Sequence, residues 1–115
     1  MLKKGTPIEE LCREAVGFLS KYIHVDRAVL FGSHARNEAR EDSDIDLAII
    51  SDDFRDMNIW ERIRLLARVS VMVDSRLELK GFSRETYENP PEASMLKEIK
   101  SRGVVVYVHD NEDRQ

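Results

Sequence analysis

Cysteine is almost absent from this sequence: Cys12 is the only one among 115 residues. A lone cysteine cannot form an internal disulfide or a zinc site built from several cysteines. Cys12 falls within a helical pattern of apolar residues, so we expect it to be a small buried hydrophobic side chain. Because the chain can form no internal disulfide, we expect it in a reducing, cytoplasmic compartment.

Long apolar runs and an excess of basic residues are also missing. No segment approaches the ~20 consecutive apolar residues that cross a bilayer, so we expect no membrane partner. The 18 Lys and Arg are outnumbered by 22 Asp and Glu, which gives a net charge of −4 and a pI near 5.4. A chain without a broad basic field is not expected to bind a nucleic-acid backbone directly.

The remaining composition is typical of a soluble globular protein. Hydrophobic residues make up 42% and charged residues 35% of the 115 residues, which allows a core and a charge-rich surface. We expect a single domain over residues 1–109, followed by a polar tail over 110–115. The sequence leaves the oligomeric state open, a homo-oligomer included.

Apolar periodicity predicts alternating helices and strands. The strands are expected at 28–31, 46–50, 76–82 and 104–108, the main helices at 7–22, 59–73 and 92–102, and shorter helical segments at 33–37 and 83–87. Thr6 and Ser83 are expected as N-caps and Gly103 as a C-cap. This order predicts an α+β fold, a mixed four-stranded β-sheet with helices packed mainly on one face, so the other face can carry a site.

Two carboxylates, Asp44 and Asp46, stand one residue apart at the start of the second strand. Side chains alternate between faces along a strand, so both should project to the same side. Two unpaired like charges repel, and a ligand set made only of oxygens suits a hard cation such as Mg²⁺ or Mn²⁺. The sequence therefore predicts a metal site at the entry to this strand.

A phosphate-binding turn is expected at Gly32 and Ser33, where the first strand ends at a helix start. The glycine lets a phosphate approach the backbone, and free N–H groups with the helix dipole favour its negative charge. A phosphate-binding turn together with metal-binding carboxylates is typical of enzymes that transfer a phosphorus-centred group.

The segment GSHARNEAREDSDIDL, residues 32–47, resembles the signature G-S-x-A-R-G-x-A-x-x-x-S-D-I-D-L of the minimal nucleotidyltransferases in the DNA polymerase β-like superfamily. The matching positions are Gly32, Ser33, Ala35, Arg36, Ala39, Ser43, Asp44, Ile45, Asp46 and Leu47. Asn37 stands where the signature has glycine. Asparagine tolerates left-handed backbone better than other residues with a side chain, so we expect the turn to be kept.

This resemblance implies a nucleotide site with ATP as the substrate. Its binding residues would be Gly32, Ser33, Arg36 and Ser43. For Arg36 the alternative is a surface salt bridge to the acidic 38–44 segment.

The resemblance also implies a third carboxylate, on a later strand. It would join Asp44 and Asp46 in holding Mg²⁺ (or Mn²⁺) and would assist deprotonation of the acceptor. Glu78 and Asp74 are the two candidates, and we favour Glu78, which lies mid-strand on the polar face. The family usually has aspartate at this place.

The function implied is transfer of a nucleotidyl group, AMP from ATP, to a hydroxyl acceptor on a partner protein. Small stand-alone members of this family resemble antitoxins paired with HEPN-domain ribonuclease toxins. The alternative is a module that binds a nucleotide or a toxin without catalysis.

The remaining polar residues give weaker indications of a function than the 32–47 segment does. His34 is expected to point to solvent, and His24 and His109 to lack clustered partners. The arginines of the 59–73 helix are expected on its solvated face: Arg62, Arg64 and Arg68.

Overall fold

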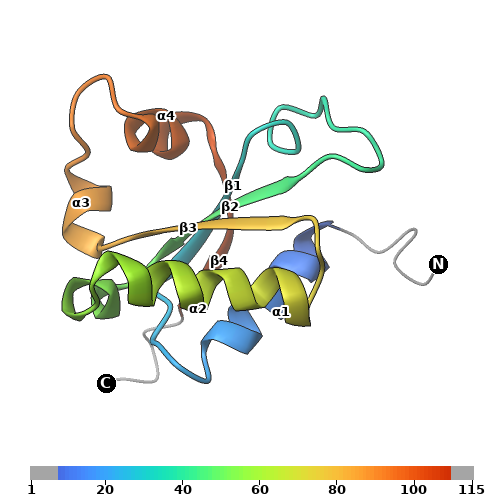
Figure 1. The fold of residues 1–115 in the computed structure, drawn as a ribbon. Helices are drawn as coiled ribbons and strands as arrows, with labels where there is room; N and C mark the ends of the chain where they lie inside the picture. The colour runs from blue at the N-terminus through green and yellow to red at the C-terminus, as the bar shows by residue number, and fades with distance from the viewer. Residues whose placement is uncertain (1–7, 110–115) are drawn as a thin grey trace.

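The computed structural model describes residues 8–109 of the chain (Figure 1). Its elements in chain order are α1 (Ile8–Leu19), β1 (Arg27–Phe31), β2 (Ile45–Ile50), a 3₁₀ helix (Asp52–Asp56), α2 (Ile59–Met72), β3 (Leu77–Phe82), α3 (Arg84–Glu88), α4 (Met95–Arg102) and β4 (Val104–Val108). The expected N-cap Thr6 and the expected 110–115 tail lie outside the described residues. None of the described helices is long and apolar enough to cross a membrane.

The four strands form one mixed sheet in the order β3-β2-β1-β4 (Figure 1). β1 lies antiparallel to both β2 and β4, whereas β2 and β3 run parallel. β2 is therefore a central strand, and the end at which it begins is also the end at which β1 finishes and β3 begins. The α+β prediction is confirmed, with element ends shifted by a few residues.

Alternation along β2 divides the structure into two apolar layers. Ile45, Leu47 and Ile49 are fully buried in the larger core cluster, which α1 and α2 supply from one face of the sheet. In Figure 1 these two helices lie together on one side of the strands. The same cluster takes in Cys12, so the prediction of a buried cysteine is confirmed. Burial raises the pKa of the Cys12 thiol to about 12, which keeps it unreactive.

The second face of the sheet is covered by the shorter helices α3 and α4. Ala48 and Ile50 of β2 pack there in a smaller cluster with Tyr87, Leu96 and Ile99. Serine side chains begin both helices: Ser83 accepts a hydrogen bond from the Thr86 N–H, and Ser94 accepts one from the Lys97 N–H. Ser94 sets the start of α4 three residues later than periodicity predicted. The end of this face nearest the start of β2 remains available for a site.

The helix expected at 33–37 is wrong, because residues 32–37 form consecutive turns. Asn37 has a φ of 63°, and the Glu38 N–H donates to the Ser33 carbonyl at 2.9 Å, which closes the turn. A helix cannot continue through a left-handed residue. The left-handed backbone expected at Asn37 is confirmed.

Arg62 of α2 does not lie on a solvated face, contrary to expectation, whereas Arg64 and Arg68 are exposed as predicted. Arg62 donates from Nη1 to the Gly81 carbonyl at 3.2 Å and stacks over the Phe54 ring. Arg68 lies over the Tyr22 ring and donates to the Tyr22 hydroxyl at 3.3 Å. The apolar stems of long basic side chains cover neighbouring hydrophobic surface in this way.

Side chains from α2 also occupy the outer edge of β3. Ser70 donates from Oγ to the Leu77 carbonyl at 3.1 Å, and Arg62 binds the Gly81 carbonyl further along the strand. Edge strands expose unpaired backbone groups to which other strands can add. These two contacts fill acceptor positions that a further strand would use.

Gly103, the predicted C-cap of α4, is confirmed as the cap, and it provides a stability prediction. A Cβ there would lie 2.5 Å from the Ile99 carbonyl oxygen and 2.5 Å from Val29 Cγ1. Gly103→Ala should therefore lower the free energy of unfolding by about 1–3 kcal/mol in urea denaturation.

Gly17 is the matched control, because a Cβ there would meet nothing within 4 Å. Gly17→Ala in α1 should raise the free energy of unfolding by about 0.5–1 kcal/mol. Equal effects of the two substitutions would contradict the packing assigned to Gly103.

Candidate nucleotide and metal site

The site is organised around Asp46, the second residue of β2. Its Cα is paired with that of Phe31 on β1 and with that of Glu78 on β3, which places it between two neighbouring strands. Gly32, directly after β1, has a φ of +76°, and a Cβ at that position would overlap Asp46 Oδ2. The missing side chain thus provides the space that the Asp46 carboxylate occupies.

The surroundings of Asp46 raise its pKa above the ordinary value of 3.8. Burial is the largest cause, and the negative charge of Asp44 is the second. Lys80, His34 and Arg36 lower the pKa but do not cancel the other two effects. The repulsion expected between Asp44 and Asp46 is therefore present, and a cation bound between them would relieve it.

The turn after β1 presents backbone donors beside this carboxylate. The N–H groups of Ala35 and Arg36 both donate to the Gly32 carbonyl, at 3.1 and 3.2 Å. Within residues 8–109, no hydrogen bond is donated by the N–H groups of Ser33 and His34. Two successive free N–H groups can bind an anionic oxygen, although no helix dipole strengthens them as had been expected.

Arg36 and Ser43 both contact neighbours within the loop. Arg36 Nε lies 2.9 Å from Glu38 Oε1 on the surface, which is the salt bridge considered as the alternative. The Ser43 hydroxyl accepts from the Arg40 N–H at 2.8 Å and closes a turn. Both groups therefore shape the loop that carries the chain from Gly32 to Asp44. Arg36 also contributes positive charge at Asp46.

The two candidates for the third carboxylate differ clearly. Glu78 is exposed and faces Asp46 in the parallel register of β2 and β3. Asp74 is only 10% exposed at its side chain, and Arg76 contacts both of its carboxylate oxygens, at 3.1 and 3.2 Å. Arg76 also donates to the Glu41 carbonyl at 3.1 Å, so this pair anchors the loop before Asp44.

A preassembled metal cluster is not found among residues 8–109: no group of three or more His, Cys, Asp or Glu side chains there is placed to hold an ion. Asp44 and Asp46 fit a hard divalent cation by their oxygen donors and mutual repulsion. The shared site with Glu78 stays a prediction, and it requires the Glu78 side chain to turn toward the pair.

His34 was expected in solvent, and this expectation is wrong. Its Nε2 is buried and has no hydrogen-bond partner among the described residues. The sequence did contain a signal for this burial. His34 directly follows Gly32 and Ser33, and a tight turn there can bring its side chain back toward the sheet.

His24 and His109 were expected to lack clustered partners, and this is also wrong. Their rings are 4.5 Å apart, and His24 Nε2 lies 3.2 Å from Asp26 Oδ1. This group lies where β1 begins and β4 ends, at the opposite end of β1 from Gly32, and is separate from the Asp46 site.

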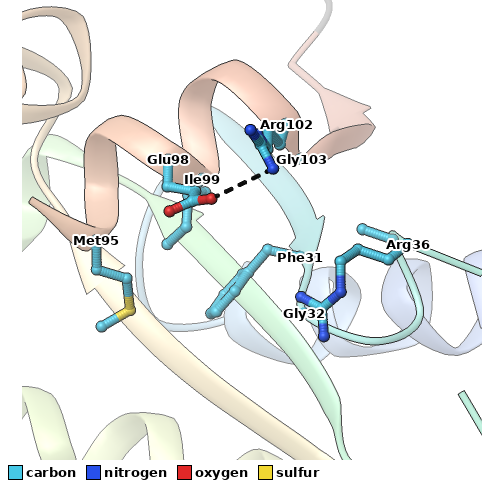
Figure 2. A pocket seen from close by; sticks show the side chains of 9 residues that line it. Phe31, Gly32, Arg36, Met95, Glu98, Ile99, Arg102 and Gly103 are labelled. Atoms are coloured by element: carbon cyan, nitrogen blue, oxygen red, sulfur yellow. Dashed lines mark ion pairs between the residues drawn. The ribbon is translucent and has the colours of Figure 1, made fainter. Parts of the chain in front are cut away.

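A cavity of about 270 Å³ adjoins the Gly32 turn and was not predicted (Figure 2). It lies between the turn and α4. Its apolar wall consists of Phe31, Met95 and Ile99, and its charged residues are Arg36, Glu98 and Arg102. Arg102 Nη1 and Glu98 Oε2 are 3.7 Å apart, the ion pair marked in Figure 2.

Comparisons with known proteins identify the family. The family described as "Polymerase beta, Nucleotidyltransferase" matches residues 14–112. The chain therefore belongs to this nucleotidyltransferase family, as the signature at residues 32–47 implied. A protein of Methanocaldococcus jannaschii named "Putative protein adenylyltransferase MJ0604" is 32% identical over 101 residues, which cover 86% of this chain and 97% of that protein.

Two solved structures share the fold. A crystal structure of "a putative nucleotidyltransferase from Sulfolobus solfataricus" superposes with a TM-score of 0.67 at 17% identity, covering 89% of this chain and 81% of the other. A crystal structure of "the toxin-antitoxin with AMP-PNP" superposes with a TM-score of 0.60 at 20% identity, covering 92% and 77%. At these identities the likeness concerns the fold alone.

The raised pKa of Asp46 gives a pH-dependent prediction. The folded state holds the Asp46 proton more tightly than the unfolded state, so ionisation costs stability as pH rises from 3.8 through the folded-state pKa. Asn cannot ionise, so Asp46→Asn should raise the unfolding midpoint at pH 7 and leave it unchanged near pH 3. Thermal unfolding at the two pH values measures this difference.

The control is Asp56→Asn, because Asp56 is exposed in the 3₁₀ helix away from the site. It should change the midpoint little at either pH. An Asp46→Asn variant that is less stable than the wild type at pH 7 would contradict the account of Asp46.

Proposed function

We propose that the chain, as a single domain over residues 1–109, is a metal-dependent transferase that moves AMP from ATP to a hydroxyl group on a partner protein. The observation that carries the proposal is the Asp46 carboxylate against Gly32, beside the free N–H groups of Ser33 and His34. A carboxylate that attracts a cation, next to backbone donors that can bind an anion, supports a site for a nucleoside triphosphate with its metal.

The triphosphate would bind at the Gly32 turn. The N–H groups of Ser33 and His34 donate to its phosphate oxygens, and Arg36 adds positive charge once it leaves Glu38, to which it is bound only at the exposed surface. Ser43 would act indirectly, because its hydroxyl holds the turn that leads into Asp44.

Asp44, Asp46 and Glu78 would hold the metal, Mg²⁺ or Mn²⁺. When bound, the ion neutralises charge on the triphosphate and on these carboxylates. The exposed position of Glu78 leaves its side chain free to turn toward Asp46, its partner in the strand register.

In the reaction, the acceptor oxygen forms a new bond to the α-phosphorus, and the bond from that phosphorus to the bridging oxygen breaks. Pyrophosphate leaves with the electron pair. The acceptor proton passes to the Glu78 carboxylate, which lies exposed on β3 and can therefore reach an incoming acceptor. Holding both reactants on one sheet face supplies the orientation that the step needs.

The protein acceptor is supported by the name of the Methanocaldococcus jannaschii relative, a protein adenylyltransferase. The toxin-antitoxin structure with AMP-PNP supports a toxin as the partner and ATP as the substrate. The resemblance of the 32–47 signature to the minimal nucleotidyltransferases favours a HEPN-domain toxin. Neutralisation by binding alone is the second candidate, since the same toxin-antitoxin likeness is compatible with it.

ATP binding tests the carboxylate pair. We expect Mg²⁺-ATP to bind the wild type in titration calorimetry, and the double variant Asp44→Asn with Asp46→Asn to lose at least about tenfold in affinity, because each lost charge removes a metal ligand. Asp56→Asn is the control and should bind as the wild type does. Absent binding, or a double variant that binds as tightly, would exclude the proposed enzyme.

Mn²⁺ binding distinguishes the two candidates for the third carboxylate. In the presence of AMP-PNP, Glu78→Gln should weaken Mn²⁺ binding about tenfold in electron paramagnetic resonance titrations, because it removes a charged ligand. Asp74→Asn should leave Mn²⁺ affinity unchanged and lower the free energy of unfolding by about 1–3 kcal/mol, because it breaks the contacts with Arg76. The reverse pattern would assign the role to Asp74.

A further inference from the structure

We infer that the cavity between Phe31 and α4 binds the nucleobase of the bound nucleotide, and that Glu98 selects a base with an exocyclic amino group, as adenine has. The inference rests on the proposed function and extends it, because it assigns a base-specific site to side chains of α4. No motif in the sequence marks these residues as a nucleotide site.

The position of the cavity is the first argument. Gly32 and Arg36, two residues of the turn that would hold the phosphates, are also part of its lining. A nucleotide whose phosphates contact the Ser33 and His34 N–H groups therefore has this cavity within immediate reach. Figure 2 shows the turn on one side of the cavity and the side chains of α4 on the other.

The size and lining of the cavity suit a flat ring. Its volume of about 270 Å³ lies just below the ~300–1,000 Å³ of typical ligand pockets, so it can take the base but not a whole nucleotide. Phe31 offers a ring for offset stacking, and the polarisable Met95 thioether and the Ile99 side chain complete an apolar surface. Met95 is 54% exposed, so covering it with a base removes apolar surface from water.

Glu98 provides the selectivity. An ionised carboxylate only accepts hydrogen bonds, so it can bind the exocyclic amino group of adenine, which unsubstituted purine lacks. The Glu98 side chain is 66% exposed, and its pair with Arg102 at 3.7 Å is long. An exposed pair of this kind contributes little stability, so Glu98 can turn to a ligand at low cost.

The same helix links the cavity to the proposed reaction centre. Met95 also borders a groove along β3 that includes Glu78 and Lys80. A base in the cavity therefore lies on one side of Met95, and the carboxylate proposed to accept the proton lies on the other. This arrangement keeps the α-phosphate between the two, near Asp46.

The test compares the Mg²⁺ complexes of ATP, of purine riboside triphosphate, which is ATP without the amino group, and of tripolyphosphate, which has no base, in titration calorimetry with the full chain. The wild type should bind ATP more tightly than either of the other two ligands. Met95→Gln keeps the length of the side chain but makes it polar, and it should weaken ATP about fivefold without changing tripolyphosphate. Glu98→Ala should reduce the preference for ATP over purine riboside triphosphate about tenfold, because it removes the acceptor for the amino group.

Met72→Gln is the matched control, since Met72 is also exposed, at 62%, but lies at the end of α2. It should leave all three affinities unchanged. Tripolyphosphate binding as tightly as ATP, or α4 variants that weaken both equally, would overturn the base site while the proposed function stands. Absence of binding by every ligand would overturn the proposed function and this inference together.

Discussion

The contact between Asp46 and Gly32 is the constraint on which the rest of the site depends. A carboxylate on a central strand can lie against the end of the neighbouring strand only because Gly32 has no Cβ and adopts a positive φ. The contact brings a negative charge to within reach of backbone donors on the adjoining turn. Both features come from two strands that pair in register, so the relative position of the two groups is as rigid as the sheet.

One face of the sheet packs against most of the core, and the other face carries the candidate site. The face that packs against α1 and α2 buries most of the core, including three fully buried side chains of β2. The opposite face carries the partly buried Asp46, whose ionised form is destabilised by burial and by Asp44. A central strand fixed from one side can tolerate such a charge on the other, because the larger core holds its backbone in place.

Much of the fold and the proximity of Asp44 to Asp46 follow from local sequence rules. Strand alternation places Asp44 and Asp46 near each other, and the pattern of helices and strands predicts the mixed sheet. The left-handed backbone at Asn37 follows from the chemistry of its side chain. These features depend on residues close together in the chain, so the sequence contains what is needed to predict them.

Apart from the helix expected at 33–37, which the left-handed Asn37 prevents, and the late start of α4 at its Ser94 cap, the features that were missed depend on packing between distant segments. Asp74 and Arg76 could be judged only once the loop at Glu41 was known to lie beside them. The Nε2 atom of the half-buried His34 is covered only once the turn packs against its surroundings, and the cavity exists because α4 packs beside β1. The periodicity of a single segment does not predict which helix will cover which part of a sheet.

The hydrogen bonds from α2 to the outer edge of β3 also bear on how the chain avoids misassembly. The strand LELKGF has no proline, and two of its carbonyls are occupied by Ser70 and Arg62 rather than by features of its own sequence. Protection of this edge is therefore a property of the docked helix. Whenever α2 detaches, a parallel edge strand next to the site becomes open to strands of other molecules, so solubility and the integrity of the site depend on the same helix.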